Sequence, residues 1–174
     1  MKIEIVPYLE INGCRTFPDD VVIKIFEKMV SDRTTKVVFY NGKTRTVQDF
    51  IRLLKSPENN VVFGLVDGEV SGVAWLNEVN DNYGTAHFCI FKEAWGKCST
   101  ELGRAALNYW FSFKRDTGDP VLDVILGVTP SRYKNVLRFI ESLGFKQIGE
   151  VPKVLYVEET GERMSAIFSY CERF

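Results

Sequence analysis

The stretch KEAWGKCSTELGRAALNYWF, residues 92–111, decides how the rest of this sequence is interpreted. It follows an apolar run typical of a strand, passes through a turn of small residues and opens a helix. A strand–turn–helix connection presents backbone N–H groups that can hold an anion. Because the turn has a single glycine, Gly96, the segment by itself indicates either a phosphate-binding loop or a plain capped connection. The expected helix, about residues 100–114, has its apolar face at Leu102, Ala105, Ala106, Tyr109, Trp110 and Phe113.

The composition indicates one globular domain spanning residues 1–174. Of its residues 45% are apolar and 26% are charged, as in ordinary soluble proteins. Lys plus Arg number 22 and Asp plus Glu number 23, so the net charge of −1 gives no reason to expect a nucleic acid or an anionic membrane as partner. No apolar run approaches the length of a membrane span.

The cysteines favour a reducing compartment. They are widely spaced, none forms a Cys-x-x-Cys pair, and the single histidine, His87, completes no metal-binding set with them. The N-terminal segment MKIEIVPYLE alternates charged and apolar residues and lacks a signal-peptide core. The sequence therefore predicts a cytoplasmic protein without a metal ion. The four cysteines are Cys14, Cys89, Cys98 and Cys171.

The first third of the chain predicts one strand, a helix, a second short strand and a second helix. Residues 2–8 have strand chemistry, and Pro18 opens a helix with acidic residues in its first turn. The run VVFYNG at 37–42 is interpreted as a short strand ending in a turn. Thr46 is the expected N-cap of a helix over 46–56.

The remainder predicts a three-stranded meander followed by helix, strand, helix and hairpin. Asp67-Gly68 joins two β-branched runs and is a strong hairpin signal. Gly144 is the expected stop of the later helix. This mixed order favours an α+β fold over a doubly wound sheet. The segments are strands at 61–79 and 85–91, the helix over 100–114, a buried strand at 121–128, a helix over 131–145, and strands at 145–157 and 163–171.

Two motifs in this order resemble the GCN5-related N-acetyltransferase (GNAT) superfamily. They are WGK…TE over Trp95–Glu101 and RFIESLGF over Arg138–Phe145. The resemblance covers residues 60–150 by motif and 1–59 by element order, and is closest to the branch that acetylates ribosomal-protein N-termini. Divergent, phage-encoded proteins are also similar to this superfamily. The resemblance implies a mixed, mostly antiparallel central sheet of about six or seven strands with helices on both faces.

The resemblance also implies a site for acetyl-CoA. The pyrophosphate is expected on the turn and on the start of the next helix, and the pantetheine arm is expected to pair with backbone near Ile90 and Phe91. The family's pantetheine-contacting Asn lies eleven residues before the glycine of Leu-Gly-Phe, where this chain has Tyr133. Asn135, two residues later, is the candidate for that contact. The predicted pyrophosphate-binding residues are Trp95, Gly96, Lys97, Cys98, Ser99 and Thr100.

For catalysis the resemblance implies direct attack by an amine on the thioester, without a covalent enzyme intermediate. His87 is the candidate general base, because an unperturbed imidazole titrates near pH 6.5. Tyr133 is the candidate general acid, since Ile140 stands where the family often has an acidic tyrosine. The alternatives are Glu78 and Glu93 as the base and Tyr156 as the acid.

Three functions are open at this point. The first is an acetyl-CoA-dependent N-acetyltransferase acting on a primary amine of a small molecule, a protein N-terminus or a lysine. The second is a non-catalytic GNAT-like binding or assembly protein, for example phage-encoded, that has lost turnover of CoA. The third is a sensor that binds CoA without turnover. Expected partners are acetyl-CoA and an amine, and an exposed edge on the terminal hairpin allows either a monomer or a homodimer.

Overall fold

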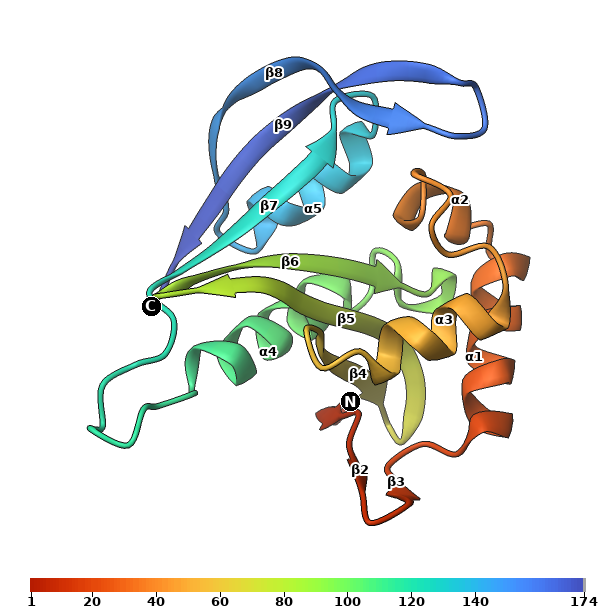
Figure 1. Cartoon of the computed structure of the whole chain (residues 1–174), viewed down its shortest axis with the longest axis vertical. Helices are drawn as coiled ribbons and strands as arrows, with labels where there is room; N and C mark the ends of the chain where they lie inside the picture. Colours follow the sequence, from red (N-terminus) through yellow and green to blue (C-terminus); the bar gives the residue numbers. More distant parts are fainter. Residues whose placement is uncertain (174) are drawn as a thin grey trace.

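The described part of the chain, residues 1–173, is shown in Figure 1 as a computed structural model. The strands of its main sheet are β1 (Ile3–Pro7), β4 (Asn60–Val66), β5 (Glu69–Asn80), β6 (Tyr83–Ile90), β7 (Val124–Pro130), β8 (Lys146–Val157) and β9 (Glu162–Glu172). They lie in the order β1-β4-β5-β6-β7-β9-β8. Neighbouring strands are antiparallel, except that β6 and β7 are parallel. The predicted mixed, mostly antiparallel α+β sheet is therefore confirmed.

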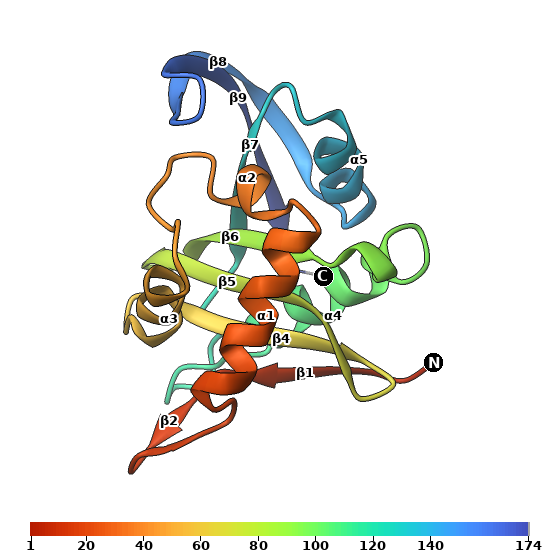
Figure 2. The ribbon, with the colours of Figure 1, turned by 90° about the vertical axis from the view of Figure 1, so that its right-hand side faces the viewer.

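Helices cover both faces of the sheet, as Figure 2 shows. On one face lie α1 (Asp19–Ser31), α2 (Thr35–Val38) and α3 (Val47–Lys55), and on the other lie α4 (Ser99–Phe111) and α5 (Lys134–Ser142). Successive side chains of a strand point to opposite faces of its sheet. Accordingly, Phe63 and Trp75 pack toward α1 and α3, whereas Val62 and Ala74 pack toward α4. Each layer of helices thus has its own apolar core.

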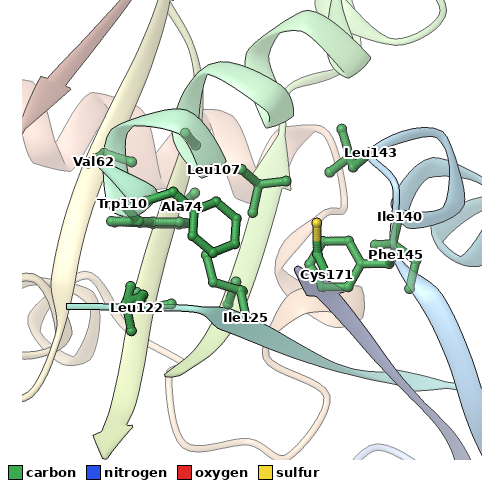
Figure 3. Close-up of a cluster of buried hydrophobic side chains, with 14 of the residues drawn as sticks. Val62, Ala74, Leu107, Trp110, Leu122, Ile125, Ile140, Leu143, Phe145 and Cys171 are labelled. Carbon is green, nitrogen blue, oxygen red and sulfur yellow. The ribbon is translucent and has the colours of Figure 1, made fainter. Parts of the chain in front are cut away.

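The second core fixes how α4 and α5 sit on the sheet. Trp110 and Leu107 of α4 are fully buried in it, together with Ile125 of β7. Leu143 and Phe145 follow α5 and join the same cluster, which Figure 3 shows in close-up. Both helices therefore pack on one shared core beside β6 and β7.

The local signals that set the boundaries of elements are confirmed. Asp67 and Gly68 have φ values of 49° and 88°, the paired positive values that a tight hairpin between β4 and β5 requires. Thr46 caps α3 in a reciprocal capping box with Asp49. Gly144 follows α5 with φ of 99°, a conformation that stops helices.

Residues 37–42 are not a strand, and this prediction was wrong. Val37 and Val38 belong to the four-residue helix α2, which Thr34 begins by accepting a hydrogen bond from the Val38 N–H at 2.9 Å. A short apolar run cannot be assigned to helix or strand by periodicity alone. Here the run packs against β6 as a helical turn, and Phe39 behind it joins the core.

Two further short elements were not predicted. A small hairpin of β2 (Glu10–Ile11) and β3 (Cys14–Arg15) turns at Asn12 and Gly13, which both have positive φ. A 3₁₀ turn, η1 (Lys92–Ala94), separates β6 from the turn that leads into α4. None of the helices described between residues 1 and 173 is long and apolar enough to cross a membrane.

Candidate active site

A cleft opens where β6 and β7 separate. The two strands pair only at Tyr83–Thr85 with Val124–Leu126, and beyond this point they diverge (Figure 1). A cavity of about 720 Å³ fills the gap, with α2 on one side and α5 on the other. This volume lies within the range of small-molecule sites in proteins.

The β6 wall of the cleft offers unpaired backbone groups. The Phe91 N–H donates to the carbonyl of Ser71 in β5 at 2.9 Å, so Phe91 and Ser71 form a hydrogen-bonded pair. Hydrogen-bonded and non-hydrogen-bonded pairs alternate along antiparallel strands. The backbone groups of Phe88 and Ile90 therefore point away from β5, toward the space that β7 has left. The Ile90 carbonyl there accepts the indole N–H of Trp95 at 2.8 Å.

Because of this alternation, the backbone groups available to a pantetheine arm differ from those expected at Ile90 and Phe91. The Phe91 N–H is used by β5, its carbonyl accepts from the Ala94 N–H at 3.0 Å, and its side chain is buried in the core. Phe91 therefore has no backbone donor left for a ligand. The N–H groups of Phe88 and Ile90 are the ones that an extended ligand in the cleft can reach.

The turn into α4 places part of the predicted phosphate loop at the cleft. Trp95, Gly96 and Ser99 line the cavity. Gly96 has φ of 68°, and no atom lies within 4 Å of the position where a Cβ would be, so a ligand can approach its backbone closely. Ser99 begins a helix of 13 residues, and the first N–H groups of a helix have no partner within it. This end of the cleft suits an anion.

Three residues predicted for the same loop lie elsewhere. The Cys98 side chain is buried among Ala94 and Leu102, and its N–H donates to the Ala94 carbonyl at 3.2 Å, so Cys98 has no free donor for a ligand. Thr100 Oγ1 shares a hydrogen bond of 3.1 Å with Ser142 Oγ. Lys97 is exposed beside the turn and does not line the cavity.

His87 lies in the cleft on the side of α2, partly buried. Its Nε2 is 3.1 Å from Asn77 Oδ1, and because an amide oxygen only accepts, Nε2 carries the proton and Nδ1 the lone pair. No group among residues 1–173 donates to that Nδ1. Burial lowers the pKa of His87 to about 4, with Glu78 acting weakly in the opposite direction. The imidazole is therefore neutral at pH 7, and its pKa lies well below the ordinary value on which the sequence-based prediction rested.

The other candidate catalytic residue, Tyr133, lines the cavity at the start of α5. Its hydroxyl accepts a hydrogen bond from Arg132 Nη2 at 2.9 Å, and the guanidinium also lies over its ring. Tyr40 lines the same part of the cavity, where burial, and then the neighbouring Tyr133, raise the pKa of Tyr40. Asn135, the second residue of α5, also lines the cavity.

The alternative acids and bases lie outside the cavity. Glu93 pairs with Lys28 of α1, and Glu78 accepts a hydrogen bond from Thr85 Oγ1 at 3.0 Å. Tyr156 is half exposed on β8. The thiol of Cys89 does line the cavity, but burial raises its pKa to about 12, which excludes a thiolate nucleophile at neutral pH.

The wall formed by α2 is what the sequence-based analysis missed. Arg33, Thr34 and Tyr40 line the cavity from this side, and Arg132 lines it from the segment before α5. No periodic pattern marks a four-residue helix, so its side chains carried no signal. Over the described range, no three His, Cys, Asp or Glu side chains are grouped so that they could hold a metal ion.

Solved structures with the same architecture are acetyltransferases. The spermidine N-acetyltransferase of Vibrio cholerae, in complex with CoA and spermine, is 15% identical and has a TM-score of 0.71, covering 98% of this chain and 95% of that one. The ribosomal-protein-S5-alanine acetyltransferase of Vibrio fischeri is 14% identical with a TM-score of 0.69, covering 98% and 92%. An acetyltransferase of the GNAT family from Streptococcus pneumoniae is 12% identical with a TM-score of 0.66, covering 99% and 100%.

The chain has the GNAT fold. No family model and no curated protein matches its sequence. At identities of 12% to 15% the likeness establishes the fold, and the chemistry has to be argued from the cleft itself. In this chain the cleft opens between β6 and β7, and the turn that leads into α4 has a single glycine, Gly96.

Proposed function

We propose that the chain is an acetyl-CoA-dependent N-acetyltransferase that moves an acetyl group directly to a primary amine. One observation carries the proposal: a single cavity of about 720 Å³ is lined both by the start of α4 and by His87 and Tyr133. An anion-binding helix start, an extended backbone edge and two proton-transfer groups thus border one space. The neighbour from Vibrio cholerae, solved with CoA, supports the same ligand.

In this proposal the backbone positions the thioester. The N–H groups at Gly96 and at the start of α4 bind the pyrophosphate. The free N–H groups of Phe88 and Ile90 hold the pantetheine arm in an extended conformation, and Asn135 contacts it from α5. Acetyl-CoA supplies the acetyl group as a thioester. Because positioning removes much of the entropic barrier, much of the rate comes from this arrangement.

The side chains near the thioester, at the other end of the cavity from the pyrophosphate, transfer protons. His87 accepts a proton from the attacking amine at Nδ1, directly or through water, while Asn77 holds Nε2–H. The amine nitrogen forms the new bond to the acetyl carbon as the carbon–sulfur bond breaks. The Tyr133 hydroxyl donates a proton to the departing sulfur, so that the sulfur leaves as a neutral thiol.

Thermal unfolding with and without millimolar acetyl-CoA tests the binding half of the proposal. A ligand at about 100 times its Kd stabilises the folded state by about 2.7 kcal/mol, which raises Tm by several degrees for a domain of this size. Ser99→Asp places a carboxylate at the phosphate position, yet an acidic residue in the first turn favours the helix itself. We therefore expect this variant to fold normally and to lose the shift, whereas Ser99→Ala keeps most of it.

Release of free CoA thiol, followed with a thiol-reactive dye in the presence of primary amines, tests the catalytic half. Amine-dependent release that His87→Gln reduces at least a hundredfold supports the enzyme. Binding of acetyl-CoA without release for any amine would instead identify a CoA sensor. The absence of both effects would contradict the proposal.

A further inference from the structure

Three cations line the cavity without a close ion-pair partner in the described chain. Arg33, Arg132 and Lys134 all line it, and none of them forms an ion pair with residues 1–173. Over the same range no Asp or Glu lines the cavity. With His87 neutral at pH 7, every charged side chain that lines the cavity is a cation. The three cations are exposed, and unpaired cations along a cleft attract an anionic ligand.

These cations are divided between the two walls. Lys134 begins α5, directly after Tyr133. Arg33 lies on the other wall, in the connection from α1 to α2, and holds a left-handed backbone conformation with φ of 61°. Arg132 lies toward the same side. Glu159 pairs with Lys36 of α2, and the pKa of Glu159 is lowered by Lys36 and also by Arg132, so Arg132 is close to this pair. Two arginines therefore remain for the ligand that enters from the α2 side.

Two acids close to this wall are already paired with cations. Glu159 pairs with Lys36 at 2.5 Å, and Glu158 pairs with Arg45. Both acids lie in the turn between β8 and β9. Because each is already paired with a cation, neither is free to bind a cationic acceptor. A polyamine would meet two arginines without a carboxylate to balance its charge, and like charges brought together in a cleft repel.

The same turn restricts the size of what can enter. The Glu158 N–H donates to the Tyr40 carbonyl at 2.9 Å, which adds a backbone bond to the two ion pairs. Three contacts thus tie the turn between β8 and β9 to α2 and to the loop that joins α2 to α3. We take these contacts at one side of the cleft to favour a small molecule over an extended protein chain.

Building on the proposed function, we infer that the acceptor is a small amine that also carries a carboxylate or phosphate group, bound by Arg33 and Arg132. The anionic group lies between the two guanidiniums, which match the geometry of both anions. The amine then extends toward His87, deeper in the same cavity. The acetyl transfer itself is the one described above, in which the amine loses a proton and the sulfur gains one.

Matched pairs of acceptors test this inference. Phosphoethanolamine is compared with ethanolamine, and phenylalanine with phenethylamine, so that the two pairs separate phosphate from carboxylate; spermidine is the polycationic comparison. The readout is kcat/KM from thiol release at saturating acetyl-CoA. We expect the anionic member of at least one pair to exceed its partner about tenfold or more, and high salt to reduce that preference.

Variants assign the preference to the two arginines. Arg33→Gln and Arg132→Gln should each reduce the ratio within the preferred pair about tenfold, and the double variant should abolish it. Lys24→Gln, which removes an exposed cation of α1 that pairs with no described residue, should leave the ratio unchanged. A preference for spermidine or for the uncharged members, or an anionic preference that survives in the double variant, would overturn the inference.

Failure of the inference can be distinguished from failure of the proposed enzyme. If no amine is acetylated, calorimetry measures binding of the same pairs to the protein with CoA, and to the free protein if CoA does not bind. Tighter binding of an anionic member that the double variant loses would keep the anionic site while rejecting catalysis. No binding of either anionic compound would overturn the site as well.

Discussion

The imidazole of His87 lies flat against the indole of Trp75, with ring centroids 5.0 Å apart and planes only 10° from parallel. Trp75 is buried and stacks in turn on Phe39, with centroids 5.7 Å apart. The stack fixes the plane of the imidazole, and Asn77 fixes which nitrogen carries the proton. His87 is thus held in one orientation and one tautomer by residues from β5 and from the segment after α2.

The low pKa of His87 makes the stability of the fold depend on pH. Because the folded-state pKa of about 4 lies below the ordinary 6.5, the unfolded chain takes up this proton first as the pH falls. The contribution is fully present above pH 6.5 and is lost progressively down to about pH 4, to a total on the order of 3 kcal/mol. Urea unfolding at pH 7.5, 5.5 and 4.5 measures it.

The control for this prediction is His87→Gln, which cannot titrate. We expect the difference in unfolding free energy between wild type and variant to shrink as the pH falls through this window. A constant difference across the window would mean that His87 keeps its ordinary pKa in the folded protein.

Asn77→Asp should raise the pKa of His87 toward its ordinary value. The substitution places a carboxylate against Nε2–H, where Asn77 Oδ1 now lies at 3.1 Å, and an opposite charge at this distance favours the imidazolium. If His87 is the base, the acidic limb of the pH–rate profile should move upward in this variant. Asn77→Leu, which removes the acceptor without adding charge, should lower the rate without this movement. An acidic limb unchanged by Asn77→Asp would remove His87 from the role of base.

Much of the fold could be predicted because local chemistry determines it. Thr46, Asp67-Gly68 and Gly144 each fix one boundary through hydrogen bonding or backbone conformation that few other residues provide. The amphipathic pattern after residue 100 likewise identifies α4. The order of these elements, together with the motifs at Trp95–Glu101 and Arg138–Phe145, resembles the GNAT superfamily, and that resemblance indicated the sheet.

The cleft was less predictable because its properties depend on several distant segments. The run at 37–42 is too short to show a period, and it is helical because of its contacts with β6. The pKa of His87 reflects burial by neighbours that no spacing along the sequence reveals. That Arg33 and Arg132 line the cavity without forming an ion pair depends on the three-dimensional positions of distant acids, which the sequence does not reveal.

The capping box of α3 should contribute measurably to stability. Thr46 Oγ1 accepts from the Asp49 N–H at 3.2 Å, and Asp49 Oδ2 accepts from the Thr46 N–H at 2.9 Å. Thr46→Ala removes one of these bonds and should cost about 1 kcal/mol, whereas Thr46→Ser should cost only a few tenths. Hydrogen bonds from the Thr46 and Arg45 backbone lower the pKa of Asp49 to about 2, so the contribution of the box persists as the pH falls to 3.8 and is lost through about 2. Equal unfolding midpoints for the two variants in urea would show that the hydroxyl is not used.

Gly103→Ala should destabilise the protein, although alanine is the better helix former. A Cβ at Gly103 would lie 2.7 Å and 2.8 Å from the two methyl carbons of Leu143 and 3.1 Å from Phe139 Cζ. Leu143 is fully buried, so its methyl groups have no free space to occupy. Overpacking costs about 1–3 kcal/mol and exceeds the gain in helix propensity of up to about 1 kcal/mol.

A net loss of roughly 1–2 kcal/mol should therefore lower the urea midpoint without changing the m-value. Gly149→Ala on β8 is the matched control, because its Cβ would meet no atom within 4 Å and its φ is not positive. This variant should have the stability of the wild type. Because Gly103 sets how closely α4 and α5 approach, and both helices border the cleft, Gly103→Ala should also weaken acetyl-CoA binding more than Gly149→Ala does. Wild-type stability and wild-type ligand affinity in Gly103→Ala would show that α5 can move away from α4 without disturbing the cleft.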